Sequence, residues 1–183
     1  YPISDGYEIV ARMHYLNASG EPLTVAPRYE WYTIETSSVT HTLGPFAWAL
    51  SNWEIPPLST FTVSSVCRPP KPMHIVNAMP HMHALGTEFF GEFSGGSLDS
   101  ERFLDSVGYD PNNGVIVQYN PAVDLSMADA VRFGCTWKNI HNKPIVEGVG
   151  DNEMCILFGY AYPYEQSYSA AANPGGCVMI APP

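Results

Sequence analysis

The chain has 183 residues, and 18 acidic against 8 basic residues give it a formal net charge of −10. This charge argues against nucleic acid and anionic lipid as partners, because both require basic surfaces. Only 14% of the residues are charged, whereas Pro (17) and Gly (15) are frequent, which indicates a compact β protein with a core and excludes a disordered chain.

Apolar and polar residues alternate along Tyr7–Leu16, which predicts a half-buried strand. Further short apolar segments between clusters of Pro, Gly and Asn predict more strands. They are Arg28–Glu35, Gly44–Leu50, Thr60–Val66, Met73–Met79, Thr87–Phe93, Val115–Tyr119, Ala130–Trp137, Met154–Tyr162 and Cys177–Ile180. No useful length of sequence has the helical period, and no apolar stretch is long enough to span a membrane. We therefore expect an all-β fold, an antiparallel jelly-roll-like β-sandwich, as a single domain over residues 1–183.

The chain begins at Tyr1 without a Met and without a signal peptide, so we expect a processed protein or an excised domain. Asn17 lies in an Asn-Ala-Ser sequon, where glycosylation would require a eukaryotic secretory route. The four cysteines form no CxxC pair; their even number suggests two disulfides in a secreted or periplasmic protein. Three connectivities are open, and buried free thiols are the alternative.

Two short stretches contain candidate metal ligands. His81 and His83 lie two residues apart in a predicted extended segment. Alternate residues of a strand point to the same side, about 6.5–7 Å apart, so both imidazoles can reach one ion. Met154 offers a thioether, and neutral nitrogen and sulfur donors suit Cu(I), whereas thioether is a poor zinc ligand. Taken singly, these residues have ordinary alternatives, namely surface histidines and a core methionine.

Three motifs together resemble a known family. They are Pro72-Met73-His74, His81-Met82-His83 with Gly86, and Asn152-Glu153-Met154-Cys155. They resemble the C-terminal catalytic half of the copper type II ascorbate-dependent monooxygenases, whose known members are peptidylglycine α-hydroxylating monooxygenase and dopamine β-hydroxylase. The similarity covers nearly the whole chain and points to a bacterial relative.

The resemblance implies that His81, His83 and Met154 bind the one copper ion that meets dioxygen and substrate, with ascorbate as the reductant. Two imidazoles and a weak thioether leave an open position on Cu(I), where dioxygen can be activated for C–H hydroxylation. His74 matches a non-ligand histidine, which we expect to be structural.

The resemblance also implies the disulfides Cys135–Cys155 and Cys67–Cys177. The second closes the longer loop, and a loop of ~100 residues is worth up to roughly 4–5 kcal/mol in the entropic model. The first would anchor the residue next to Met154.

The sequence departs from the family at the second copper, which relatives hold with three histidines in an N-terminal domain. This chain has no His-His pair, and His14 resembles one ligand of that site. We interpret His14 as a remnant, with a solvent-facing strand histidine as the alternative, and we expect an upstream N-terminal copper domain as a partner. His41 and His141 match no ligand, and we expect His141 to be solvated.

The substrate anchors of the peptide-hydroxylating member are changed as well. Its arginine, asparagine and tyrosine are replaced by Met79, Ile156 and Phe158. Without the arginine a bidentate grip on a carboxylate is lost, so we expect no glycine-extended peptide substrate. We predict an apolar pocket lined by these three residues, with Met82 as a fourth candidate, for an apolar small molecule; all four could instead belong to the core.

Two functions of different classes remain open. The first is the copper domain of a monooxygenase, inactive as an isolated domain if it depends on an upstream partner. The second is a secreted mononuclear copper protein for binding, delivery, storage or redox chemistry without hydroxylation. A structural domain that has lost catalysis is a third interpretation, and it predicts no tight copper binding.

Overall fold

The computed structural model describes residues 6–11, 13, 15, 17–69 and 73–164, and the backbone of 177–180. The chain divides into two compact units, Tyr1–Thr42 and Leu43–Pro183. This division does not test the expectation of a single domain over residues 1–183, which stays a prediction. The helices of the described residues are short 3-10 turns, η1 (Thr36–Ser38), η2 (Gly96–Leu98) and η3 (Leu125–Met127), none of which has the length or apolarity needed to cross a membrane.

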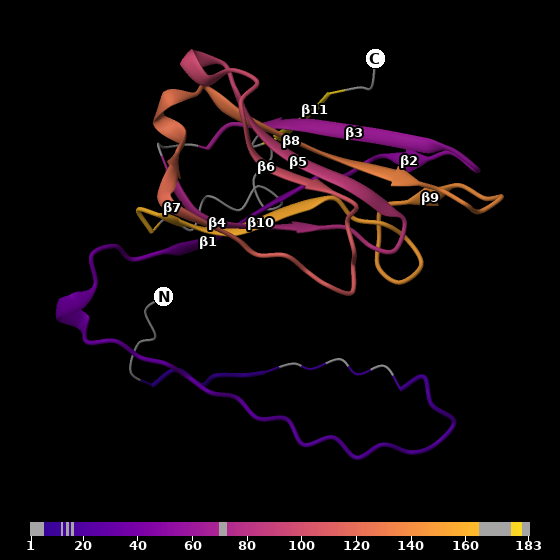
Figure 1. Cartoon of the computed structure of the whole chain (residues 1–183), viewed down its shortest axis with the longest axis horizontal. Helices are drawn as coiled ribbons and strands as arrows, with labels where there is room; N and C mark the ends of the chain where they lie inside the picture. The colour runs from indigo at the N-terminus through magenta and orange to yellow at the C-terminus, as the bar shows by residue number, and fades with distance from the viewer. Residues whose placement is uncertain are drawn as a thin grey trace. The chain divides into compact units, whose positions relative to one another are not determined.

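All named strands lie in the second unit, where they form an antiparallel β-sandwich, so the predicted all-β fold is confirmed (Figure 1). One sheet has the order β1-β10-β4-β7, with β1 Gly44–Ala49, β10 Ile156–Tyr162, β4 His74–His81 and β7 Val117–Asp124. The other has the order β11-β3-β8-β5-β6, with β11 Cys177–Ile180, β3 Thr60–Cys67, β8 Ala130–Lys138, β5 Gly86–Ser94 and β6 Arg102–Val107. A small third sheet pairs β2 (Glu54–Ile55) with β9 (Ile145–Val146).

Large apolar side chains fill the space between the two main sheets. Burial alternates along β1, so that Phe46 and Trp48 point into the core while the residues between them are more exposed. Trp48 meets Phe133 of the opposite sheet at a ring-centroid distance of 6.5 Å. Trp53 stacks on Trp137 at 4.6 Å. The two inner faces therefore interdigitate as expected for a sandwich.

Two predicted strands are wrong. The described residues of Tyr7–Leu16 and all of Arg28–Glu35 lack strand structure. Their alternating pattern is typical of a half-buried strand, but a strand also needs a partner for its backbone hydrogen bonds. Instead most of the described apolar side chains of this unit are exposed, as at Tyr7 (75%) and Trp31 (61%).

Three strands were not predicted from the sequence, and each omission has a physical reason. β2 and β9 are two residues long and therefore show no period. β6 is an edge strand in which exposed residues are interspersed with partly or fully buried ones, so its sequence is mixed and not clearly apolar. β7 extends beyond the predicted end at Tyr119 through Pro121, which an edge strand tolerates.

The close approach of β10 to β4 gives a test of this packing. A Cβ added at Gly159 would overlap the main-chain oxygen of Asn77 and lie 2.5 Å from the ring of Phe46. We expect Gly159→Ala to lower the free energy of unfolding by about 1–3 kcal/mol, because neither neighbour can yield easily. Urea denaturation measures the change, with Gly114→Ala as the control, since a Cβ there meets nothing within 4 Å. Equal stability of the two variants would contradict the packing.

Candidate metal centre

The candidate ligands lie at the point where β4 ends and β10 begins. Burial alternates along β4, so Pro80 points into the core while Met79 and His81 lie half-buried on the outer face of the four-stranded sheet. In the β4–β10 ladder, His81 is opposite Ile156 and Met79 is opposite Phe158. Facing residues of an antiparallel pair share one side of the sheet. The outer face therefore carries an imidazole with three apolar side chains next to it.

The rings of His81 and His83 lie 5.3 Å apart between centroids and are nearly perpendicular, at 86°. A metal–imidazole bond of about 2.0–2.1 Å puts the ring centre roughly 3.2 Å from the ion, so two rings at a tetrahedral angle would be about 5.2 Å apart. The observed separation fits two imidazoles on one ion. No group of three or more His, Cys, Asp or Glu side chains in the described part of the chain is placed to hold a metal.

One hydrogen bond fixes the tautomer of His83. Its Nδ1 lies 2.6 Å from the main-chain oxygen of Asn152. A carbonyl oxygen only accepts, so Nδ1 must carry the proton and donate it. The lone pair is then left on Nε2, which is the form of imidazole that binds a metal. The same contact joins the histidine segment to the residue two positions before Met154.

Glu153 supports the candidate site from within the Asn152–Cys155 motif, a role that the sequence did not predict for it. Its carboxylate is almost completely buried (1% exposed) and accepts three hydrogen bonds. The main-chain N–H of His83 donates to Oε2 at 2.8 Å and that of Leu85 to Oε1 at 2.7 Å. The indole N–H of Trp137 donates to Oε2 at 2.9 Å. Within a polar run such as Asp151-Asn152-Glu153 an acid is typical of an exposed loop, and no periodicity marks it as buried.

The electrostatics favour a neutral imidazole at His81. Partial burial lowers the pKa of His81, and the neighbouring His83 lowers it further, whereas the Glu153 carboxylate acts in the opposite direction. A metal ligand must be deprotonated, so a lowered pKa keeps the ring available for metal near neutral pH.

A disulfide anchors the residue after Met154. Cys155 is bonded to Cys135 of β8, as predicted, and its main-chain oxygen accepts a hydrogen bond from Leu50 at 3.0 Å. Met154 itself is half-buried and stands between this disulfide and the buried Glu153. Its neighbours on both sides are therefore fixed, and its thioether as the third ligand stays a prediction.

The second disulfide remains a prediction. Cys67 is disulfide-bonded, and in the backbone ladder of β3 and β11 it stands opposite Cys177. The side chain of Cys177 lies outside the described residues.

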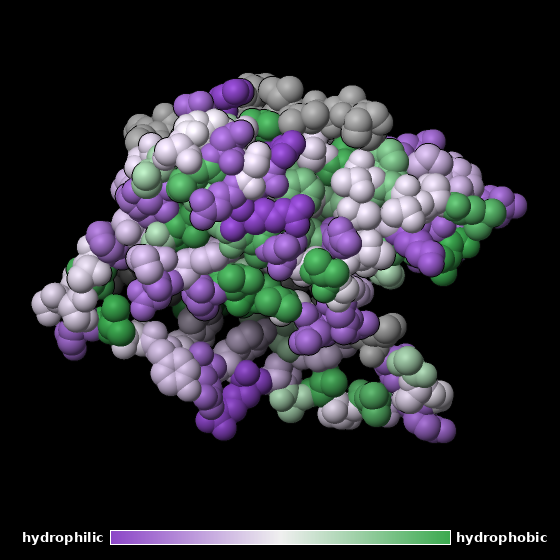
Figure 2. All heavy atoms as spheres, turned by 45° about the horizontal axis from the view of Figure 1, so that its top comes forward, coloured by the Kyte–Doolittle hydropathy of each residue, from purple (hydrophilic) through white to green (hydrophobic). Residues whose placement is uncertain are grey.

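Of the four residues predicted to line a pocket, three are half-buried and the fourth belongs to the core. Met79, Ile156 and Phe158 are half-buried, and the Phe158 ring lies 5.8 Å from that of His81. On the face shown in Figure 2, apolar and polar side chains of the surface are mixed. Met82 is 1% exposed and belongs to the core, so it does not lie on the outer face of the four-stranded sheet with the other three residues. A pocket formed by the other three stays a prediction.

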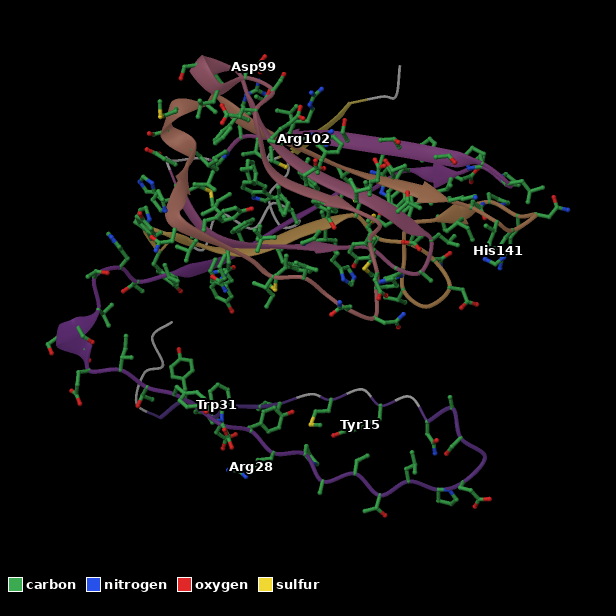
Figure 3. The ribbon with its side chains drawn as sticks, in the orientation of Figure 1. Tyr15, Arg28, Trp31, Asp99, Arg102 and His141 are labelled. Atoms are coloured by element: carbon green, nitrogen blue, oxygen red, sulfur yellow. A yellow bond between two sulfur atoms is a disulfide. The ribbon has the colours of Figure 1, made fainter. Side chains whose placement is uncertain are left out.

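The remaining histidines lie elsewhere. His74 stacks on Tyr162 at 4.7 Å, and its Nδ1 is 3.5 Å from Asp124. His141 is exposed in the loop between β8 and β9 (Figure 3). His41 is exposed in the first unit. The predicted remnant, His14, lies outside the described residues.

The buried carboxylate makes a testable prediction. In Glu153→Gln an NH2 group replaces one carboxylate oxygen and faces the donor or donors that point at that oxygen, so we expect the free energy of unfolding to fall by about 1–3 kcal/mol. The matched control is Glu147→Gln, an exposed acid that accepts one hydrogen bond, from the main chain of Asn52 at 3.2 Å. We expect its effect to stay within about 0.5 kcal/mol. Urea denaturation of the metal-free protein measures both changes. Similar values would contradict a stabilising role of the three hydrogen bonds to Glu153.

Comparison with known proteins identifies the family. A model of the copper type II ascorbate-dependent monooxygenase C-terminal domain matches residues 46–174, which is more than half of the chain. No curated protein matches at a significant level. The matched range contains the histidine pair, the buried Glu153 and the Cys135–Cys155 disulfide. The chain therefore belongs to the copper type II ascorbate-dependent monooxygenase family, as a C-terminal domain.

Proposed function

We propose that this chain is the copper-binding domain of an ascorbate-reduced monooxygenase that hydroxylates C–H bonds. His81, His83 and Met154 would hold one copper ion, which when bound supplies the chemistry that activates dioxygen. The observation that carries the proposal is the pair of imidazoles, 5.3 Å apart, with the Nε2 lone pair of His83 set by its hydrogen bond to Asn152.

The residues around the pair have separate tasks in this proposal. Glu153 and Asn152 orient His83 through its main-chain N–H and its Nδ1. Met79 and Phe158 stand opposite each other on the same outer face and would contact an apolar small-molecule substrate. Neither side chain can form an ion pair with a carboxylate, which supports an apolar substrate over a glycine-extended peptide.

The proposal includes an upstream partner and an oxidising compartment. The Cys135–Cys155 disulfide is typical of secreted or periplasmic proteins. Relatives use a second copper for the second electron, and we propose that an upstream N-terminal copper domain fills this role.

One observation favours a second candidate function. In the part of the chain that the structure describes, His41, His74 and His141 belong to no group of three or more His, Cys, Asp or Glu side chains that could hold a metal, so no second copper site is built there. A secreted copper protein that binds, stores, delivers or cycles a single copper without hydroxylation is therefore the alternative.

Copper binding tests the shared part of both functions. We expect the reduced protein to bind one equivalent of Cu(I) in competition with a chelator. His81→Ala should abolish binding, because one imidazole and a thioether are too few donors, and Met154→Leu should weaken it about 10- to 100-fold. His141→Ala, an exposed histidine, is the control and should leave binding unchanged. Absence of binding by the wild-type protein would refute both functions.

The two functions separate when ascorbate and oxygen are supplied to the copper-loaded protein with small apolar test compounds. A hydroxylated product supports the monooxygenase. Peroxide alone, with the copper still bound, supports the non-hydroxylating protein.

A further inference from the structure

A tyrosine outside the ligand motifs contacts the residue between the two histidines. Tyr109 follows β6, and its main-chain N–H donates to the oxygen of Thr87 at 3.0 Å, which fixes its backbone to β5. Its hydroxyl accepts from the main-chain N–H of Met82 at 3.0 Å and donates to the main-chain oxygen of Met82, also at 3.0 Å. One hydroxyl thus satisfies both main-chain groups of one residue, as a strand partner does in an antiparallel ladder.

The two hydrogen bonds of the Tyr109 hydroxyl act on the two peptide units that connect Met82 to the histidines. The N–H of Met82 belongs to the peptide unit that joins it to His81, and the oxygen belongs to the unit that joins it to His83. Each peptide unit is a rigid plane. Holding both planes therefore restrains the Cα atoms of His81 and His83, from which the two imidazoles extend.

Packing prevents Met82 from adjusting on its other side. The Met82 side chain is 1% exposed and fills the space next to Gly86, where an added Cβ would lie 2.8 Å from the Cβ of Met82. The next residue, His83, is held through its own N–H by Glu153. The tripeptide is thus fixed by a hydroxyl, a packed thioether and a carboxylate.

We propose that Tyr109 is a positioning residue for the copper site, which holds the imidazoles of His81 and His83 in their binding geometry before the metal arrives. This inference rests on the proposed function. Partners of metal ligands typically change metal affinity by about 10- to 100-fold, and a site held in advance loses less entropy on binding. Because Tyr109 acts on the backbone and not on a ligand atom, we expect an effect at the lower end of that range.

The test is Tyr109→Phe, which keeps the ring and removes only the hydroxyl. The matched control is Tyr119→Phe, because Tyr119 is also half-buried and donates its hydroxyl to a main-chain oxygen, that of Phe103 at 3.0 Å. We expect Cu(I) affinity to fall about tenfold in the first variant and to stay within about twofold in the second. The amide of Met82 should also exchange its hydrogen faster in metal-free Tyr109→Phe, and the EPR spectrum of the Cu(II) form should change in this variant alone.

Gly86→Ala disturbs the same residue from the opposite side and should weaken Cu(I) binding in the same direction. It therefore provides a second, independent variant if Tyr109→Phe folds poorly. Wild-type affinity and an unchanged EPR spectrum in Tyr109→Phe would overturn the inference, as would an equal loss of affinity in Tyr119→Phe. If the wild-type protein itself binds no Cu(I), the proposed function fails first, and that result is distinct from failure of the variant alone.

Discussion

The candidate site depends on one buried carboxylate. Glu153 receives the main-chain N–H groups of His83 and Leu85 from the segment after β4, and the indole N–H of Trp137 from β8. A buried charge is unfavourable unless its hydrogen bonds are satisfied, so these donors must stay in place while the protein is folded. The carboxylate consequently joins the segment that carries the histidines to the segment that carries Met154, although about seventy residues separate them.

Other contacts orient the residues next to the candidate ligands, in addition to the hydrogen bonds of Glu153. Tyr109 fixes the peptide planes on both sides of Met82, and Asn152 fixes the tautomer of His83. The disulfide to Cys135 holds the chain on the far side of Met154. None of these contacts uses the Nε2 of His83, because Asn152 accepts from Nδ1 and the others involve the backbone or different side chains, so the Nε2 lone pair stays free for a metal ion.

Sequence patterns predicted the strands that build the sandwich well, because their apolar segments, such as the one with Phe46 and Trp48, are bounded by turn-forming residues and supply the large side chains of the core. The same rule failed at Tyr7–Leu16 and at Arg28–Glu35. Periodicity reports a preference for burial on one side, but it does not show whether a partner strand exists. β6 was not predicted because it has a partner strand but no clear apolar pattern, which an edge strand does not need.

For the site, spacing predicted that His81 and His83 share a side, and the resemblance gave the Cys135–Cys155 pair. The supporting contacts could not be predicted. Glu153 and Tyr109 reach their partners across sequence separations of 70 and 27 residues, and nothing in a single sequence encodes such distances. Met82 shows the limit of local reasoning, because a one-residue step along the chain moves a side chain from the outer face to the core.

X-ray absorption at the copper edge tests the central claim most directly, namely that two imidazoles and one thioether meet at a single Cu(I). The account predicts two nitrogen ligands from imidazole and one sulfur ligand in the reduced, copper-loaded protein, with the sulfur contribution lost in Met154→Leu while the imidazole signal persists. A spectrum without sulfur, or a sulfur signal that survives in Met154→Leu, would contradict it.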